Sequence, residues 1–346
     1  MSTRFADVRT ILAEAVRSGA TPAAGLEAGR AGVVVWRTAA GRLTYDPGAP
    51  AAVEDTIFDL ASLTKVVATA SIAMRLLEAR RLTLAERVAS LAPEWRGAER
   101  TLVTIRDLLE HSSGLPAWAP LFVNHAGRPA FQSAIGAQPL EYPPWTRSVY
   151  SDLGFMLLGF LLEDAGGAPL DAQFAALRLE GLTFRPDPSL RARIAPTRED
   201  PWRGRLLAGE VDDDNAWGLG GVAGHAGLFG TASDVGAFAR LVLATWRKET
   251  TLGRPETLRR FVIRSTVPGS SRALGWDTML PTSSCGTLLS PRAIGHTGFT
   301  GTSLWIDPER DVYVVLLTNR VHPTPKNDAL PALRPAVHDA VVRALE

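Results

Sequence analysis

The spacing of apolar residues predicts short strands near both ends of the chain and helices between them. Residues 4–18 repeat at helical intervals and form the first expected helix. Residues 31–36 and 42–45 are rich in strand-forming side chains, and the turn signal at 39–41 predicts an antiparallel hairpin between them. The expected C-terminal elements are strands over 273–276, 293–296, 302–306 and 312–317 and a closing helix over 333–345.

Helical spacing dominates the middle of the chain. In the segment FDLASLTKVVATASIAM, residues 58–74, apolar side chains recur so densely that the predicted helix buries most of its circumference. Residues 152–165 are apolar on nearly every side and predict a second buried helix. Further helices are expected over 82–91, 104–110 and 233–246. Residues 116–148 predict a long loop, and 181–215 an irregular segment.

This order of elements favours a mixed α/β (α+β) fold. Strands from both ends of the chain are expected to form one antiparallel sheet flanked by the terminal helices, with a mainly helical domain inserted. The expected boundaries give one domain of residues 1–60 plus 247–346 and a helical domain of residues 61–246. The 346 residues leave room for two such domains.

Composition narrows the classes of partner. The formal net charge of +1 at pH 7 gives no electrostatic argument for a nucleic acid or a membrane surface. No apolar stretch approaches the length of a membrane span. The N-terminal residues lack the apolar core and cleavage site of a secretory signal, so we expect a cytoplasmic protein. The chain has 1 cysteine, Cys285, which excludes an intrachain disulfide.

Candidate chemistry begins with Ser62 and Lys65, three residues apart where the apolar helix of 58–74 starts. Positions three apart lie about 60° from each other around a helix, so the hydroxyl and the amine can meet. The unpaired N–H groups of a helix start favour negative charge, and apolar surroundings favour a neutral lysine. A serine nucleophile with a lysine base needs these conditions. The same tetrapeptide also fits a helix cap followed by a solvated lysine.

Two further places carry candidate chemistry, although each alone also fits a packing role. Tyr150 follows a proline-rich loop and precedes the buried helix of 152–165. His296, Thr297 and Gly298 end a predicted strand at a glycine turn, where the backbone can approach a ligand closely.

Other classes of site lack support in the sequence. The glycine-rich residues 218–230 match no phosphate-binding loop, which argues against nucleotide binding. The 6 histidines are scattered without an HExxH motif, and Asp212–Asp214 is expected to be a solvated loop rather than a cation site. The G-x-S-x-G motif of α/β-hydrolases is absent. We therefore expect neither a metal nor an organic cofactor.

Taken together, three motifs resemble those of the serine β-lactamase and penicillin-binding protein superfamily. FDLASLTK, VYSDLGFMLLG and GHTGFTG occur in the order and spacing of that superfamily, and they look most like its class C β-lactamase branch. Family VIII carboxylesterases and D-Ala-D-Ala carboxypeptidases belong to the same branch. The turn HSSGLP and the stretch DNAWGLGGVAGHAGLFGTASD are also similar to segments of such hydrolases. The resemblance covers roughly residues 30–320.

The resemblance implies an active site in the cleft between the two domains and a role for each matching residue. Ser62 would be the acylated nucleophile, Lys65 its base or proton acceptor, and Tyr150 the proton shuttle to the leaving group. The backbone N–H groups of Ser62 and Phe299 would form the oxyanion hole. Whether Lys65 or Tyr150 takes the serine proton stays open at this point.

Two departures from the family pattern affect the expected substrate. Asp152 stands where β-lactamases often have asparagine, and its carboxylate would hold Lys65 charged and favour Tyr150 as the base. His296 replaces a frequent lysine, and neutral imidazole attracts a substrate carboxylate less than an ammonium does. Arg292 or Arg320 would restore the charge if the fold brought either arginine into the cleft.

The sequence therefore predicts a serine hydrolase that cleaves ester, or amide, bonds through an acyl-serine intermediate, resembling a carboxylesterase. Asp152, His296, Thr297 and Gly298 are expected to support substrate binding. A β-lactamase or D-Ala-D-Ala carboxypeptidase is the alternative reading, and acyl transfer to an alcohol or amine is a variant of the same chemistry. A catalytically silent binding protein on this fold is the alternative from a different class.

Overall fold

The fold is described here from a computed structural model over residues 3–249, 252–326 and 329–346. The strands are β1 (Ala23–Arg30), β2 (Val33–Gly41), β3 (Phe58–Asp59), β4 (Thr183–Phe184), β5 (Glu199–Asp200), β6 (Arg205–Leu206), β7 (Leu228–Gly230), β8 (Asp277–Thr278), β9 (Ile294–Thr297), β10 (Ser303–Asp307) and β11 (Val312–Thr318). The α-helices are α1 (Ala6–Arg17), α2 (Ser71–Glu78), α3 (Val88–Leu91), α4 (Ile105–Leu109), α5 (Gly127–Ala137), α6 (Asp152–Gly166), α7 (Leu170–Ala175), α8 (Asp214–Gly218), α9 (Ala232–Arg247), α10 (Pro255–Phe261) and α11 (Leu330–Leu345).

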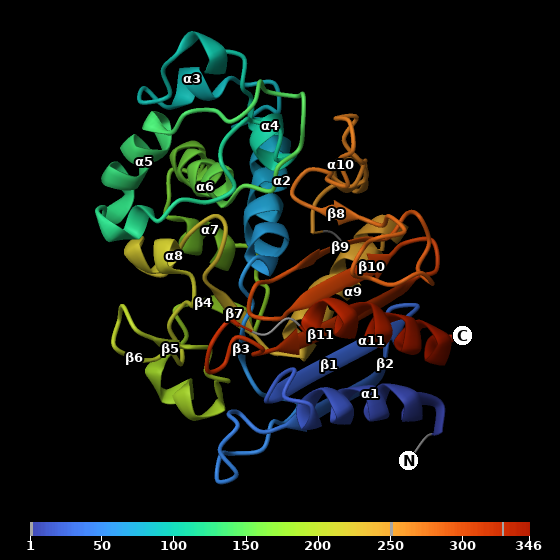
Figure 1. The fold of residues 1–346 in the computed structure, drawn as a ribbon. Helices are drawn as coiled ribbons and strands as arrows, with labels where there is room; N and C mark the ends of the chain where they lie inside the picture. Colours follow the sequence, from blue (N-terminus) through green and yellow to red (C-terminus); the bar gives the residue numbers. More distant parts are fainter. Residues whose placement is uncertain (1–2, 250–251, 327–328) are drawn as a thin grey trace.

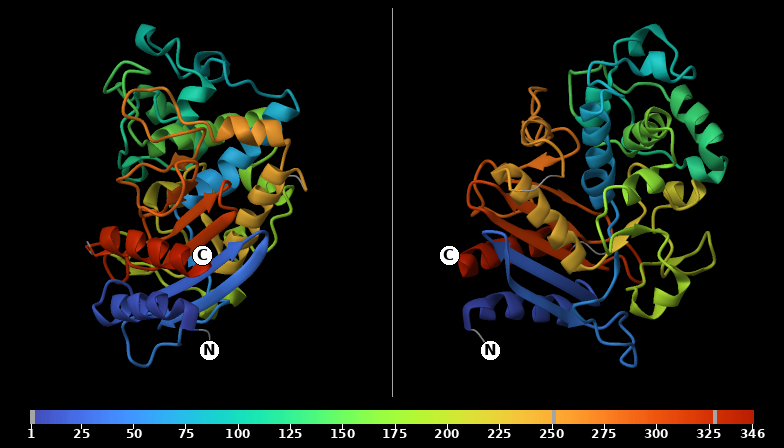
Figure 2. Two further views of the ribbon diagram at one scale, coloured as in Figure 1. Left: turned by 90° about the vertical axis from the view of Figure 1, so that its right-hand side faces the viewer. Right: turned by 180° about the vertical axis from the view of Figure 1, so that it is seen from behind.

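A six-stranded antiparallel sheet in the order β2-β1-β11-β10-β9-β8 unites the two ends of the chain (Figure 1). The N-terminal strand β1 pairs with the C-terminal strand β11, from Ala24 opposite Thr318 to Arg30 opposite Val312. Helices α1 and α11 cover one face of this sheet and α9 covers the other (Figures 1 and 2). Alternate residues of β11 therefore enter two different hydrophobic cores, one on each side of the sheet.

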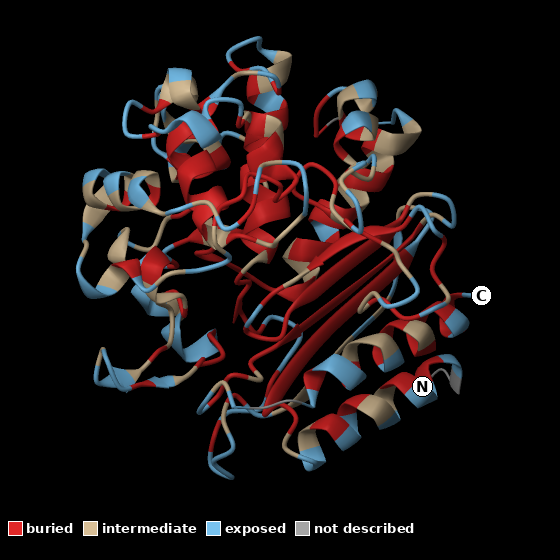
Figure 3. Cartoon of the chain, turned by 45° about the horizontal axis from the view of Figure 1, so that its top comes forward, coloured by how far each residue is buried: buried red, intermediate tan, exposed pale blue. Residues whose placement is uncertain are grey.

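The helical part of the chain packs around two central helices. A π-helix over Lys65–Ala70 continues into α2, and α6 lies against this segment. Every residue of α6 from Leu153 to Leu162 is buried, and Figure 3 shows the same concentration of buried residues inside the sheet. Helix α6 approaches the backbone of Gly224 closely at Gly159. A larger residue would crowd this contact, because a Cβ on Gly159 would lie 3.0 Å from the backbone of Gly224. Helix α6 thus packs closely on the segment of Gly224 as well as on the π-helix and α2.

The structure confirms the expected fold class and corrects several local predictions. The N-terminal hairpin consists of β1 and β2 joined at residues 31–32, rather than strands over 31–36 and 42–45. The predicted hairpin is wrong because the small residues of β1 have low strand propensity, and pairing on both sides makes them a strand. Of the helix expected over 82–91 only α3 forms, and the expected loop over 116–148 contains α5.

The division into residues 1–60 plus 247–346 and residues 61–246 remains a prediction. Helix α9, which lies in the expected helical part, packs directly on β1 and β11. Among the helices of the described residues, none combines the length and the apolar character that crossing a membrane requires. The expected cytoplasmic location likewise remains a prediction.

A buried ion-pair cluster joins the sheet to α9. Glu27 lies in the middle of β1 with no exposed surface, and its carboxylate accepts hydrogen bonds from Arg37 Nε at 2.5 Å and Tyr313 Oη at 2.7 Å. Arg240 of α9 also pairs with Glu27 and with Tyr313 Oη. A charge removed from water needs such partners, so the cluster fixes where α9 sits on the sheet.

Substituting Glu27→Ala is expected to lower the free energy of unfolding by about 3–5 kcal/mol, because Arg240 would keep a partly buried charge without its partner. Urea unfolding followed by circular dichroism measures this change. The exposed pair of Glu14 with Arg17 provides the control, since Glu14→Ala is expected to cost less than about 1 kcal/mol. Equal losses in the two variants would contradict the structural role of Glu27.

Candidate active site

A single cavity of about 700 Å³ collects most of the residues singled out from the sequence. It lies where the start of the π-helix meets the end of β9 and the loop before α8. The predicted site residues that line it are Ser62, Tyr150, Asp152, His296, Thr297, Gly298 and Phe299. Lys65 lies directly behind Ser62 and is fully buried. The fold therefore brings together predicted site residues from three distant stretches of the chain, around 62–65, 150–152 and 296–299.

A tight turn before the π-helix presents Ser62 to this cavity. Ala61 adopts a left-handed conformation with φ of 48°, and its N–H donates to Asp59 Oδ1 at 2.8 Å. The other carboxyl oxygen, Asp59 Oδ2, accepts the backbone N–H of Asp212 at 2.7 Å. Strand β3 leads into the turn and pairs with β7. A left-handed alanine and a π-helix both cost free energy, and such features concentrate at functional sites.

Lys65 is the centre of the polar contacts. Its Nζ donates to Ser62 Oγ at 2.9 Å, to Asp152 Oδ1 at 2.6 Å and to the carbonyl oxygen of His225 at 3.1 Å. These three bonds use all three donors of the ammonium group. Burial disfavours the charged form, but the Asp152 carboxylate and Tyr150 outweigh burial and raise the pKa of Lys65. The ammonium form therefore predominates at neutral pH, in contrast to the neutral lysine that apolar surroundings alone would favour.

Tyr150 lies beside Lys65, two residues before α6 begins. The Lys65 Nζ is 4.7 Å from the centre of the Tyr150 ring. Burial raises the pKa of Tyr150, Lys65 opposes that shift and Asp152 adds to it, so the phenol is protonated at neutral pH. A hydrogen bond with Ser62 also stabilises the phenolate form. In the resting site the ammonium, the phenol and the Asp152 carboxylate thus share one proton network.

His111 is a residue of this site that the sequence left without a role. Its ring lies 4.7 Å from that of Tyr150 and 4.8 Å from that of Phe155, centre to centre. Nδ1 accepts the N–H of Ser151 at 3.0 Å, and Nε2 has no hydrogen-bond partner among the described residues. Burial keeps the pKa of His111 well below its usual value, so the ring is neutral. The only sequence feature that pointed to His111 was its place at the start of the turn HSSGLP, which resembles a segment of related hydrolases.

The turn after β9 forms the opposite edge of the cavity. A Cβ on Gly298 would lie 2.1 Å from Thr302 Oγ1 and 2.8 Å from the carbonyl oxygen of Leu60. Thr302 Oγ1 donates to that same carbonyl at 2.9 Å, and Thr300 Oγ1 donates to the Asp59 carbonyl at 2.8 Å. Only a glycine permits this contact between the β9 turn and the segment before the nucleophile. The contact fixes the backbone of Phe299 relative to that of Ser62.

The charge at this edge comes from arginines rather than from His296. Burial keeps the pKa of His296 well below its usual value, with Arg272 adding to the effect, so its imidazole is neutral. Arg272, which sequence reasoning missed, places Nη1 3.4 Å from His296 Nε2 and its guanidinium 4.9 Å from the Tyr150 ring centre. Arg320 also lines the cavity, whereas Arg292 is exposed and lies 4.0 Å from Glu309. Of the two arginines considered from the sequence, only Arg320 is in the cleft.

A third arginine comes from α11. Arg334 lines the cavity, and its Nη2 donates to the carbonyl oxygens of Gly298 at 2.6 Å and Thr302 at 3.0 Å. Burial and the nearby Arg320 lower the pKa of Arg334 to about 10, which still leaves it charged at neutral pH. Arg272, Arg320 and Arg334 thus make this wall of the cavity cationic.

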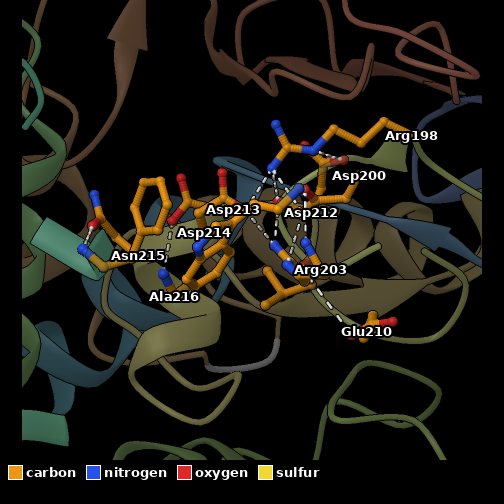
Figure 4. Close-up of polar contacts among 12 residues, drawn as sticks. Arg198, Asp200, Arg203, Glu210, Asp212, Asp213, Asp214, Asn215 and Ala216 are labelled. Atoms are coloured by element: carbon orange, nitrogen blue, oxygen red, sulfur yellow. Dashed lines mark hydrogen bonds and ion pairs between the residues drawn. The ribbon is translucent and has the colours of Figure 1, made fainter. Parts of the chain in front are cut away.

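The opposite wall is acidic and corrects one prediction. Asp212, Asp213 and Asp214 line the cavity instead of forming a solvated loop, and Asp212 is only 3% exposed. Arg198 and Arg203 hold this segment in place through the contacts drawn in Figure 4. The prediction was wrong because two arginines from the irregular region fold back over the acidic run. Within the described ranges, no group of three or more His, Cys, Asp or Glu side chains is arranged to hold a metal ion.

Comparisons with known proteins agree with this arrangement. The family model described as Beta-lactamase matches residues 8–338. A provisionally named D-alanyl-D-alanine carboxypeptidase of Escherichia coli (strain K12) is 33% identical over 306 residues, covering 77% of this chain and 70% of that protein. A protein of the same name from Salmonella agona (strain SL483) is 32% identical over 310 residues, covering 78% and 71% of the two chains.

Two solved structures share the fold at low sequence identity. EstCE1, a hydrolase with promiscuous acyltransferase activity, has a TM-score of 0.75 at 21% identity and covers 97% of this chain and 98% of its own. A class C β-lactamase from Rhodobacter sphaeroides has a TM-score of 0.76 at 18% identity, with coverage of 98% and 99%. The matched family model spans nearly the whole chain and includes all the cavity residues above. The chain belongs to the β-lactamase family, and it is a serine hydrolase of the β-lactamase and penicillin-binding protein superfamily.

Proposed function

We propose that Ser62 is the acylated nucleophile of a hydrolase that cleaves ester and amide bonds whose leaving group carries a carboxylate. The observation that carries this proposal is the contact of Lys65 Nζ with both Ser62 Oγ at 2.9 Å and Asp152 Oδ1 at 2.6 Å. A serine hydroxyl is a weak nucleophile until a neighbouring group takes its proton. Lys65 and Tyr150 are the groups within reach of that proton.

The proton transfer that we propose runs through Tyr150. Since Asp152 holds Lys65 as an ammonium, the base forms when the network loses one proton and Tyr150 becomes a phenolate. The phenolate takes the proton of Ser62 as Ser62 Oγ attacks the carbonyl carbon. The resulting phenol then donates this proton to the leaving group as the bond to the carbonyl carbon breaks. Water then attacks the acyl-serine ester with the same phenolate as its base, which releases the acid and restores Ser62.

The backbone N–H groups of Ser62 and Phe299 are the proposed donors to the oxyanion. Within the described residues, neither N–H donates a turn or loop hydrogen bond, so both are available to a substrate. The packing of Gly298 against Leu60 supports this role because it holds the two backbone segments together. Losing one such donor typically costs about 3–4 kcal/mol of transition-state stabilisation.

The cationic wall supports a carboxylate on the leaving group. Tyr150 protonates the leaving group in this mechanism, and Arg272 lies against the Tyr150 ring. Arg334 and Arg320 add charge on the same side. A peptide ending in D-alanine and a β-lactam both carry such a carboxylate, and the Escherichia coli relative is named for the first of these substrates. We therefore favour D-alanyl peptides and esters of similar shape.

Hydrolysis of simple esters is the second candidate. Neutral His296 occupies the position that carries a lysine in many relatives, so the direct contact at the strand edge is uncharged. An ester without a carboxylate needs no positive charge at this edge, so a neutral His296 does not weaken its binding. The two candidates share the Ser62 chemistry and differ in how strongly the arginines select the leaving group.

The substitution Ser62→Ala tests the nucleophile. We expect kcat/KM for a p-nitrophenyl ester to fall at least about a thousandfold, because no acyl-enzyme can form. Covalent labelling by a fluorophosphonate probe, observed by mass spectrometry, should disappear in parallel. The exposed Ser90→Ala variant is the control for folding and probe specificity. Undiminished turnover or labelling in Ser62→Ala would contradict the proposal, and absence of labelling in the natural chain would favour a silent binding protein.

The substitution Asp152→Asn tests the proton network. Asp152 raises the pKa of both Lys65 and Tyr150, so its neutralisation lowers both values. The activity of a base rises as pH increases through its pKa, and we expect the rising limb of kcat/KM against pH to move to lower pH. A pH profile with one ester substrate measures this shift, with Asp164→Asn as a remote control. A limb that stays in place or moves to higher pH would exclude Asp152 from the network.

The substitution Arg272→Gln tests leaving-group selection. Two esters of the same acid are compared: the 3-carboxyphenyl ester, whose leaving group carries a carboxylate, and the phenyl ester, whose leaving group does not. We expect the ratio of kcat/KM for the first over the second to fall about tenfold or more, because a charge-assisted contact is lost. Arg292→Gln removes an arginine outside the cavity and should leave the ratio unchanged. An unchanged ratio in Arg272→Gln, together with a natural ratio near one, would favour the simple esterase.

A further inference from the structure

Asp213 lies on the acidic wall of the cavity that contains Ser62. It is the residue just before α8, and α8 lies on the other side of the π-helix from β9 in the front and rear views (Figures 1 and 2). Tyr150, His296 and Arg272 lie together at the β9 side. Since the proposed leaving group departs toward Tyr150, the acyl part of a substrate extends toward Asp213.

The other acidic side chains of this wall are neutralised by partners. Asp214 Oδ1 lies 2.7 Å from both Arg198 and Arg203. Behind the wall, Asp200 Oδ2, which does not line the cavity, lies 2.9 Å from Arg203 Nε. Figure 4 draws the contacts of Arg198 and Arg203 with these acidic residues as dashed lines. Asp212 lies 3.5 Å from Arg198, and burial raises the pKa of Asp212 above its usual range. None of these three carboxyl groups is available to a ligand as an isolated negative charge.

Asp213 differs from its neighbours because no arginine pairs with it among the described residues. Oδ1 accepts the N–H of Ala216 at 2.7 Å and lies 2.8 Å from His225 Nε2. Oδ2 makes no hydrogen bond within the described part of the chain, and the side chain is 26% exposed. Burial opposes its ionisation, but His225 and the Ala216 N–H lower the pKa of Asp213 to about 2. One carboxylate oxygen is therefore charged, fixed in place and open to the cavity.

His225 provides an independent sign that this place receives a ligand. Its side chain is buried, it lines the cavity, and Nδ1 has no hydrogen-bond partner among the described residues. A buried polar atom without a partner costs free energy unless something else pairs with it. The backbone carbonyl of the same residue accepts the Lys65 ammonium at 3.1 Å. The Asp213–His225 pair is thus held in fixed relation to the proposed nucleophile.

We propose that Asp213, oriented by His225, binds an ammonium group on the acyl part of the substrate. The inference rests on the proposed function of Ser62 and adds a substrate class to it: acyl groups that carry a free amine. Together with the arginine wall, this subsite makes the cavity complementary to zwitterionic substrates, with the amine at the acyl end and the carboxylate at the leaving group. A carboxylate that is paired with no arginine and has one oxygen free of hydrogen bonds within the described residues attracts a cation of this kind.

Matched acyl esters test this proposal. p-Nitrophenyl β-alanine ester and p-nitrophenyl butyrate differ mainly in an ammonium replacing a methyl group, and the 6-aminohexanoate and heptanoate esters form a second pair with longer reach. Each kcat/KM is divided by the rate of spontaneous hydrolysis in the same buffer. We expect the natural chain to prefer the amine in at least one pair by about tenfold or more, and rising salt to weaken the preference.

The variant Asp213→Asn removes the charge and keeps an oxygen for Ala216 and His225, so the local fold has the same hydrogen bonds. We expect the amine preference to fall about tenfold or more. Asp187→Asn, which changes a capping aspartate outside the cavity, is the matched control and should keep the preference. Both ratios use esters with the same leaving group, so the arginine wall does not contribute to them.

The outcomes separate the two proposals. Hydrolysis that depends on Ser62 but shows no amine preference in either pair, or a preference that survives in Asp213→Asn, would overturn the ammonium subsite alone. Hydrolysis that continues unchanged in Ser62→Ala would overturn the proposed function itself. The amine preference of the natural chain is measured without any variant. Its absence would refute the ammonium subsite even if the Asp213→Asn protein folded poorly.

Discussion

The buried ammonium of Lys65 is the interaction on which the rest of the cavity depends. A lysine without exposed surface is costly unless its three donors are paired. Here the acceptors are Ser62, Asp152 and the backbone of His225, which come from three different parts of the chain. Moving any of them leaves a buried charge unpaired, so the π-helix, the start of α6 and the loop before β7 are fixed together. The candidate catalytic geometry is thus also a condition of stability.

The sheet meets this centre through backbone contacts. Thr300 and Thr302 donate to carbonyls of the segment just before Ser62, and Gly298 leaves room for that approach. These residues lie in the turn that joins β9 to β10, and β10 pairs in turn with β11 at the middle of the sheet. Strain in the turn at Ala61, where φ is 48°, is therefore held by contacts on both sides. A rigid scaffold below and a buried charge above determine where the serine points.

Features with a strong local pattern were predictable from the sequence. The run of apolar residues in α6 and the short apolar runs of β9 to β11 match the structure closely, because burial on both sides leaves a visible pattern. Strand β1 was missed because alanine and glycine give no such signal. The proximity of Arg272 to His296 was also beyond sequence reasoning, since only the folded chain brings these residues to 3.4 Å. Local pattern identifies the motifs, and tertiary packing decides their charge.

The distribution of charge in the cavity is the property that the three sequence motifs predict least well. The strand motif carries a neutral imidazole at His296, yet the guanidinium of Arg272 lies directly beside it. In the acidic run, arginines pair with Asp212 and Asp214, whereas Asp213 pairs with His225 and keeps one oxygen without a hydrogen bond among the described residues. Both effects come from side chains outside the motifs, so relatives with the same three motifs need not share substrates. In such a family the residues around the nucleophile determine the reaction, and the arginines and carboxylates that fold over it determine which molecules react.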